Sequence, residues 1–163
     1  MALLRRRSSL AVRRAVDAVP FWWHSIDLGN GVVTPGSKSR ELLAAEWDKA
    51  RVPDLHGKSL LDIGAWDGFF SFEAERRGAV VTALDYFEWS TDTAKKMRYW
   101  RECQEQGVAP KRYQEVADLW QPDRLPGKHG FDTARRLLKS RVADVVADFT
   151  TVDLDRLGTF DVV

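Results

Sequence analysis

The sequence has few of the residues that build metal sites or disulfide frameworks. Only one of its 163 residues is a cysteine, Cys103, and the three histidines, His24, His56 and His129, lie far apart. A lone cysteine excludes a disulfide framework and a cysteine-cluster zinc site, and it is typical of proteins in the reducing cytosol. The sequence therefore predicts a cytoplasmic protein without a bound metal.

The chain also lacks a long hydrophobic run and a large net charge. No stretch is long and apolar enough to cross a bilayer, so no membrane association is expected. The formal net charge is only +1, which leaves no electrostatic footprint for nucleic acid across the whole chain. Basic residues on a helix are usually solvated, and on their own they allow RNA binding without indicating it. Two predicted helices carry such clusters: Lys95, Lys96, Arg98 and Arg101 on one, and Arg135, Arg136, Lys139 and Arg141 on the other.

The N-terminus is also strongly basic. Its first fourteen residues contain five arginines and no acid, a composition that resembles an organellar presequence. It also fits a solvated helix that begins near Ser9 and buries Leu10, Val12 and Val16. We favour the helix, because the apolar positions continue without a break into residues 19–21.

The rest of the chain alternates strand and helix patterns. We expect residues 1–50 to form an N-terminal extension and residues 51–163 an α/β domain. The extension should contain a hairpin with the turn Gly29-Asn30-Gly31, followed by a helix over 40–50. The predicted strands are 58–63, 79–84, 142–147 and 160–163; the predicted helices are 69–77, 92–106 with Ser90 as its cap, 112–120, 131–141 and a short piece at 154–157. This alternation predicts a Rossmann-like, doubly wound parallel sheet.

The order of such a sheet places the fourth strand beside the first. A fourth strand that ended at Val163 would be short, and its outer edge would be unpaired. Because a buried-type strand at an exposed edge promotes aggregation, we expect the chain to be the N-terminal, cofactor-binding half of a longer protein.

Residues 59–85 carry the most informative pattern. A short apolar strand enters the turn Gly64-Ala65-Trp66-Asp67-Gly68, a helix follows, and a second buried strand ends in Asp85. A β-α-β unit of this kind is built to hold a nucleoside, because the turn lets the ligand approach the backbone and the distal carboxylate can bind both ribose hydroxyls. The simpler alternative is a plain strand-turn-helix in which Asp62 and Gly64 only cap the turn.

The identity of the nucleoside depends on two bulky residues. The dinucleotide fingerprint G-x-G-x-x-G would require glycine at 66 and 69, where this chain has Trp66 and Phe69. A pyrophosphate needs bare backbone N–H groups at the start of the helix, so these residues argue against NAD or FAD. An oxidoreductase domain that binds a dinucleotide remains the alternative, together with a fragment that only binds nucleoside.

The pattern Asp62-x-Gly64-x-x-x-Gly68 resembles the first motif of the class I S-adenosylmethionine-dependent methyltransferases, from which it departs at Trp66. The segments FWWHSIDLGNGVVTPG, LLDIGAWDGFFSFEAERRGA, GFDTARRLLKSRV and LGTFDVV also resemble the branch related to bacterial tRNA wobble-uridine (5-carboxymethoxyuridine/5-methoxyuridine) methyltransferases. The resemblance covers about residues 20–163. It implies a Rossmann-like methyltransferase fold and S-adenosylmethionine as donor, with a tRNA as one option for an otherwise unknown methyl acceptor.

The resemblance also implies a set of cofactor-binding residues. Asp62 and the backbone of Gly64, Ala65, Trp66, Asp67 and Gly68 would face the methionyl group, Asp85 the ribose, and Tyr86, Asp148 and Phe149 the adenine. The Asp67 side chain could add a charged contact to the methionyl ammonium. Three of these residues have simpler explanations: Asp67 could cap the next helix, Tyr86 could pack in the core, and Asp148 could stabilise a turn. Methyl transfer needs no catalytic nucleophile from the protein, because the methyl acceptor is itself the nucleophile, and no catalytic residue is identified.

The aromatic segment Trp22-Trp23-His24 allows two interpretations. Aromatic residues beside a proline usually fill the core under an N-terminal helix, and this interpretation is favoured. They could instead form a lid over the cofactor or stack on an acceptor base. His24 as a general base is a further option, although a single hydrogen bond would be enough to explain it.

Overall fold

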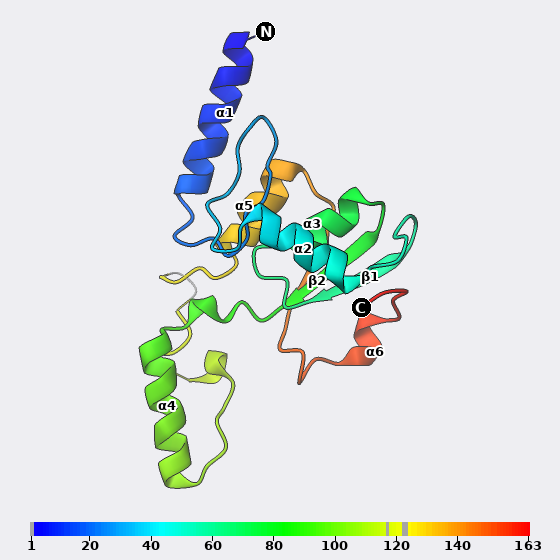
Figure 1. The fold of residues 1–163 in the computed structure, drawn as a ribbon. Coiled ribbons are helices and arrows are strands. Elements are labelled where there is room, and N and C mark those ends of the chain that lie inside the picture. Colours follow the sequence, from blue (N-terminus) through cyan, green and yellow to red (C-terminus); the bar gives the residue numbers. More distant parts are fainter. Residues whose placement is uncertain (1, 117, 122–123) are drawn as a thin grey trace. The chain divides into compact units, whose positions relative to one another are not determined.

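The structure is a computed structural model that describes residues 2–116, 118–121 and 124–163, with side chains from residue 9 onward. The chain divides into two compact units, which are described separately (Figure 1). Unit 1 comprises Met1–Tyr86 and His129–Val163, and unit 2 comprises Phe87–Lys128. The expected division at residue 50 stays a prediction.

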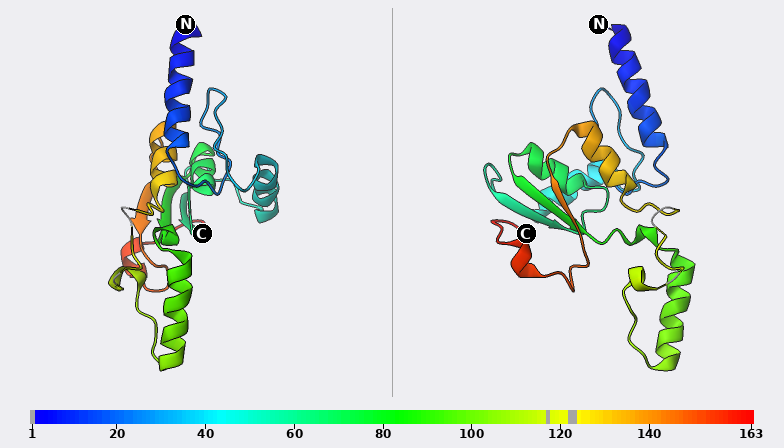
Figure 2. Two further views of the ribbon diagram at one scale, coloured as in Figure 1. Left: turned by 90° about the vertical axis from the view of Figure 1, so that its left-hand side faces the viewer. Right: turned by 180° about the vertical axis from the view of Figure 1, so that it is seen from behind.

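Unit 1 is built around a three-stranded parallel sheet. The strands β1 (Ser59–Ile63), β2 (Val80–Asp85) and β3 (Ala143–Val146) lie side by side with β2 in the centre (Figure 2). Both pairs are parallel, so all three carboxyl ends meet at one edge of the sheet. The protein is therefore an α/β protein, as predicted, and this part of the sheet is compatible with a Rossmann-like fold.

Two helices cover one face of this sheet. Asp62 and Asp144 are both register partners of Ala83, so their side chains point to the same face. Ser71 of α3 (Phe69–Arg76) hydrogen-bonds to Asp62, and Arg135 of α5 (His129–Leu138) forms an ion pair with Asp144. The two crossover helices therefore lie on the same side, and Phe72 and Phe131 pack against each other between them.

The segment predicted as a fourth strand lies beside β1. Leu60 forms a parallel bridge with Val162, and the Leu61 amide donates to the Val162 carbonyl at 3.0 Å. This places the segment where the sequence predicted it, but it forms a single bridge rather than a strand over 160–163. Between β3 and this segment lies the short helix α6 (Leu154–Leu157), which Asp153 caps.

The N-terminal region of unit 1 contains two helices and the predicted hairpin. The turn at Gly29–Gly31 has positive φ at all three residues, and Asp27 and Val33 on either side of it form an antiparallel β-bridge. The helix α2 (Arg40–Ala50) is found where it was predicted, with Ser39 as its cap. The helix α1 spans Ala2–Asp17, so the predicted start near Ser9 was too late.

The burial predicted for α1 is only partly right. Val16 is buried and Val12 is half-buried, but Leu10 is 52% exposed. The helix contacts α5 at its C-terminal end, and Trp22 closes this junction by donating its indole N–H to the Val16 carbonyl. Leu10 lies outside that junction, which explains its exposure.

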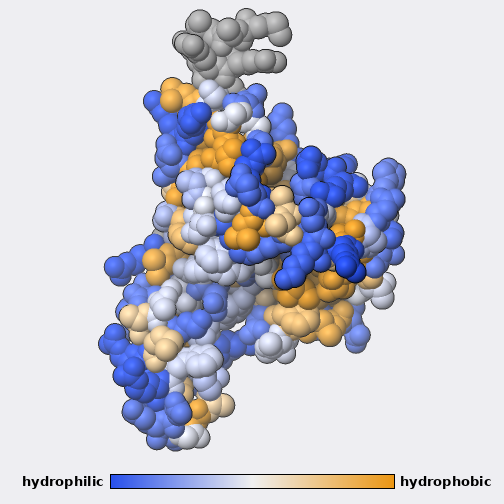
Figure 3. Space-filling model, in the orientation of Figure 1, coloured by the Kyte–Doolittle hydropathy of each residue, from blue (hydrophilic) through white to orange (hydrophobic). Residues whose placement is uncertain are grey.

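In its described residues, unit 2 contains the helix α4 (Thr93–Gln106) and two 3-10 turns, η1 (Glu88–Ser90) and η2 (Tyr113–Glu115). Asp92 caps α4, and the prediction that Ser90 does so was wrong, because Ser90 is buried within η1. The predicted helix over 112–120 is reduced to η2, and residue 117 within it lies outside the described residues. Hydrophilic colours dominate this unit in Figure 3.

The remaining element boundaries differ from the predictions by a few residues. The helix predicted over 131–141 is α5, which begins two residues earlier and ends at Leu138. The strand predicted over 142–147 is the shorter β3, and β2 includes Asp85 as its last residue. These shifts leave the order of elements along the chain as predicted.

Candidate nucleoside site at the turn after β1

The turn between β1 and α3 lies at the carboxyl edge of the sheet. Gly64 continues the ladder by donating its amide to the Leu84 carbonyl at 2.8 Å, which places it opposite the end of β2. On the other side of β2, the Ala147 amide donates to the Asp85 carbonyl at 3.1 Å. The ends of all three strands thus converge around Asp85. In open α/β sheets, ligands bind outside the carboxyl ends of the strands.

The two glycines of the turn serve different purposes. Gly64 has a φ of 79°, and a Cβ at this position would meet nothing within 4 Å, so there is open space beside its backbone. Gly68 has a φ of 90°, and a Cβ there would lie 2.5 Å from Phe72 and 2.8 Å from Phe131. Gly68 is therefore required by packing between α3 and α5, whereas Gly64 leaves room for a ligand.

Asp85 is connected directly to the turn. Its Oδ2 accepts a hydrogen bond of 2.7 Å from the backbone amide of Trp66. Trp66 itself adopts a left-handed conformation with a φ of 56°, which is uncommon for a bulky residue. The carboxylate that the sequence assigned to a ribose thus also fixes the middle of the turn.

Asp62 lies below the turn on the helix-covered face of β1. Its Oδ2 accepts a hydrogen bond of 2.5 Å from the Ser71 hydroxyl. Burial raises the pKa of the Asp62 carboxyl above its ordinary value, although the Ser71 hydroxyl and the nearby His24 imidazole act in the opposite direction. The Asp85 carboxylate adds to the increase, so the two acids are close enough to interact.

Asp67 has a role that was not among those predicted. It does not cap α3, whose N-cap is Gly68 and has no side-chain cap. Instead its Oδ2 accepts hydrogen bonds from the backbone amides of Trp23 at 2.7 Å and His24 at 3.0 Å, and its Oδ1 is paired with His24 Nδ1. Asp67 is buried, so this cluster joins the N-terminal segment to the turn.

This connection determines where the aromatic segment lies. Trp22 is buried, in agreement with the favoured core interpretation. Trp23 is half-buried and stacks on Trp66 with ring centroids 4.8 Å apart, so it covers the turn instead of filling the core. The Lys38 ammonium lies 5.9 Å from the centroid of Trp23. The indole of Trp66 is thus held against the N-terminal segment.

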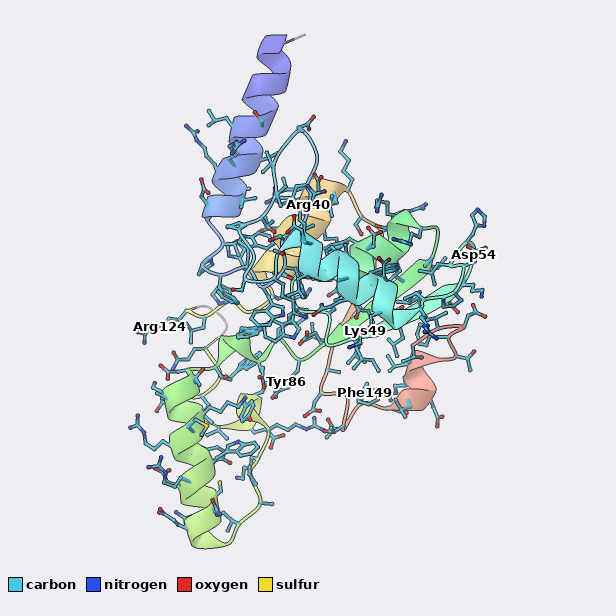
Figure 4. All side chains as sticks on the ribbon, viewed as in Figure 1. Arg40, Lys49, Asp54, Tyr86, Arg124 and Phe149 are labelled. Atoms are coloured by element: carbon cyan, nitrogen blue, oxygen red, sulfur yellow. The ribbon has the colours of Figure 1, made fainter. Side chains whose placement is uncertain are left out.

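The residues expected at the adenine follow β2 and β3 in the chain, and Figure 4 labels two of them, Tyr86 and Phe149. Tyr86 follows β2 and is half-buried. Asp148 stabilises a turn by accepting hydrogen bonds from the amide and hydroxyl of Thr150, at 2.8 and 2.6 Å. Phe149 is 47% exposed on the connection to α6. The turn interpretation of Asp148 is therefore confirmed, while contact of these three residues with adenine stays a prediction.

A cavity of about 620 Å³ lies elsewhere in unit 1, next to α2 and α3. Its apolar lining includes Leu28, Trp47, Phe72 and Leu137, and Arg77 lies over the Trp47 ring. Its volume is that of a small-molecule pocket. None of the residues expected at the cofactor lines it. Asp27 and Glu73 face its three arginines, Arg40, Arg76 and Arg77, and form ion pairs with them.

Comparison with known proteins gives no family. No protein-family model and no curated protein matches the chain. Among the residues that the structure describes, no helix is long and apolar enough to span a membrane, and no group of three or more His, Cys, Asp or Glu side chains is placed to hold a metal ion. The assignment of function therefore depends on the geometry of the turn and on the sequence motifs.

Sequence reasoning missed the pairing of His24 with Asp67. The two residues are 43 positions apart, and neither belongs to a pattern that predicts the contact. One signal was present: Asp67 directly precedes Gly68 at the start of a helix, yet it is too early to be the N-cap. A buried carboxylate that does not cap a helix must accept hydrogen bonds from other donors.

Proposed function

We propose that this protein is an S-adenosylmethionine-dependent methyltransferase, or the cofactor-binding part of one. The observation that carries the proposal is the hydrogen bond between the Asp85 carboxylate and the Trp66 amide, at the edge where the parallel strands end. It joins the two parts of a nucleoside site, the turn after the first strand and the acid after the second. A nucleoside in this position would lie against the turn, with its ribose hydroxyls at Asp85.

The chemistry of the turn favours this cofactor over a dinucleotide. A pyrophosphate requires anion-binding N–H groups and close approach at the start of the helix. Here one amide, that of Trp66, is already bound to a carboxylate, and Asp62, Asp67 and Asp85 surround the turn with negative charge. Such surroundings repel a pyrophosphate and attract the ammonium and sulfonium groups of S-adenosylmethionine.

Methyl transfer from a sulfonium is an in-line displacement that depends mainly on positioning. The acceptor oxygen or nitrogen must lie close to the methyl group and in line with the leaving sulfur. Orientation of this kind can supply on the order of 7 kcal/mol or more of barrier reduction. Residues 62–68 and 85 would hold the donor. For the acceptor, the sequence resemblance favours a tRNA wobble uridine derivative.

The proposal is tested by calorimetric titration of the full chain with S-adenosylhomocysteine and, in parallel, with NADH. We expect saturable binding of S-adenosylhomocysteine and no binding of NADH. Binding of NADH alone would favour a dinucleotide oxidoreductase domain. Binding of neither would reject a nucleoside site at this turn.

A further inference from the structure

One polar atom next to the turn has no partner. His24 is 3% exposed, and its Nδ1 is paired with the Asp67 carboxylate. Among the residues that the structure describes, none hydrogen-bonds to the other ring nitrogen, Nε2. Every fully buried polar side-chain atom among the described residues has a hydrogen-bond partner. Because Nε2 has none, it is not fully buried and a ligand can reach it. A buried imidazole with one nitrogen held and the other open is arranged to bind something.

The orientation of the ring is fixed from several sides. The Asp67 carboxylate already accepts two backbone N–H groups on Oδ2, and we assign the proton of the third bond to His24 Nδ1. The Phe69 and Phe70 rings pack against the imidazole, each with its centroid 5.9 Å away. The His24 carbonyl accepts a hydrogen bond of 2.6 Å from the Thr34 hydroxyl. With Nδ1 facing Asp67, the position of Nε2 is determined.

The proposed cofactor has an end that matches this arrangement. The methionyl part of S-adenosylmethionine is a zwitterion, with an ammonium group and a carboxylate on one carbon. The ammonium needs an acid, and Asp62 is a half-buried acid that forms no ion pair within the described residues. The carboxylate needs a donor, and the acids around the turn provide none. His24 lies close enough to Asp62 to interact with it electrostatically.

We infer that His24 Nε2 hydrogen-bonds to the methionyl carboxylate of the cofactor, with Asp67 as the residue that positions the ring. This inference rests on the proposed function and assigns the amino-acid end of the same site. A donor at Nε2 requires the imidazolium form, because Nδ1 already donates to Asp67. The Asp62 and Asp67 carboxylates lie nearby to balance that charge. The segment around His24 is thereby part of the cofactor site and not merely a cover.

Two ligands separate this inference from the proposed function. S-Adenosylhomocysteine has the amino-acid end, whereas 5′-methylthioadenosine has the same nucleoside and sulfur without it. Calorimetric titrations of the full chain should show that the wild type binds S-adenosylhomocysteine more tightly. Equal affinity for the two ligands would overturn the inference but leave a nucleoside site. Failure of both to bind would reject the proposed function as well.

The decisive variant is His24→Asn. The amide nitrogen of asparagine can replace Nδ1 as the donor to Asp67, but nothing replaces Nε2. We expect S-adenosylhomocysteine to bind roughly tenfold to a hundredfold more weakly to this variant, as for loss of a hydrogen bond to a charged group, with the affinity for 5′-methylthioadenosine unchanged. His24→Gln, whose amide can reach the position of Nε2, should lose less. Unchanged affinity of His24→Asn for S-adenosylhomocysteine would overturn the inference.

A measurement on the wild type keeps the test independent of how the variants fold. In protein with ¹⁵N-labelled histidine, the Nε2 resonance of His24 should shift when S-adenosylhomocysteine is added. It should stay in place when 5′-methylthioadenosine is added. An equal response to both ligands, or a response to neither, would contradict contact between Nε2 and the carboxylate.

Discussion

The carboxylate of Asp67 accepts hydrogen bonds from the backbone amides of Trp23 and His24, which lie 44 and 43 positions earlier in the chain. Through this contact, the turn after β1 and the N-terminal segment form one structural element. The half-buried rings of Trp23 and Trp66 stack on each other within it. The cover over the candidate site is therefore held by hydrogen bonds to the turn as well as by apolar packing.

The first prediction concerns the stability of this connection. Asp67→Ala leaves two backbone amides and the His24 imidazole without an acceptor in a buried place. We expect the free energy of unfolding to fall by about 3 kcal/mol or more, measured by urea denaturation. Asp161→Ala is the matched control, because Asp161 also accepts a backbone amide and a hydroxyl from distant Ser59, but at an exposed site. If the two variants lost equal stability, the contribution of burial at Asp67 would be disproved.

The second prediction concerns the pH dependence of stability. Burial raises the pKa of Asp62 in the folded state above its ordinary value of 3.8. The folded state therefore binds more protons than the unfolded state between the two pKa values. The resulting stability is present at lower pH and is lost as pH rises from about 3.8 through the raised pKa. Above that range the loss stays constant.

Asp62→Asn removes this ionisation and keeps an acceptor for the Ser71 hydroxyl. The difference in unfolding free energy between variant and wild type, measured by denaturation at a series of pH values, should shift in favour of the variant as pH rises through the same range. A difference that does not change with pH would show that Asp62 has the same pKa in both states.

The third prediction compares the two glycines of the turn. Gly68→Ala combines a positive φ with overlap against the Phe72 and Phe131 rings, so it should lower the unfolding free energy by roughly 2–5 kcal/mol. Gly64→Ala has only the unfavourable φ and should cost about 1–2 kcal/mol. Its larger effect should be on binding of S-adenosylhomocysteine, because the new methyl group occupies the open space beside the backbone. Thermal denaturation and calorimetry of both variants measure the two effects.

The fourth prediction concerns Asp85. Asp85→Ala removes the acceptor proposed for the ribose hydroxyls, and we expect S-adenosylhomocysteine to bind roughly 1–3 kcal/mol more weakly by calorimetry. Asp85→Asn keeps an acceptor for the Trp66 amide and serves as the control for the shape of the turn. Asp148→Ala should affect binding less, because its carboxylate already serves the Thr150 turn. An unchanged affinity of Asp85→Ala would remove Asp85 from the site.

Much of the sheet and its turn followed from local patterns in the sequence. Strand β1, helix α3 and the acid at the end of β2 are signalled by an apolar run, a glycine pair and a second apolar run. The contacts that shape the turn were not predictable, because they join residues far apart in sequence. The pairing of His24 with Asp67 and the stacking of Trp23 on Trp66 are of this kind.

The errors at the helix ends have a different cause. Ser90 and Asp92 are both good caps and lie two residues apart, so the local sequence could not decide between them. The turn η1 includes Ser90, whose buried hydroxyl oxygen accepts a hydrogen bond from the Gly127 amide, and this leaves Asp92 as the cap. For Gly68, the resemblance implied only that its backbone faces the methionyl group. Only the packing of α3 against α5 shows that neighbouring rings require a glycine there.

The position of the proposed cofactor can be mapped directly by following backbone amide resonances during a titration with S-adenosylhomocysteine. We expect saturable shifts of Gly64, Trp66 and Asp85, because these residues form the turn and its acid. Shifts confined to Leu28, Trp47 and Leu137 would instead place the ligand in the cavity next to α2, and would contradict a nucleoside site at the turn.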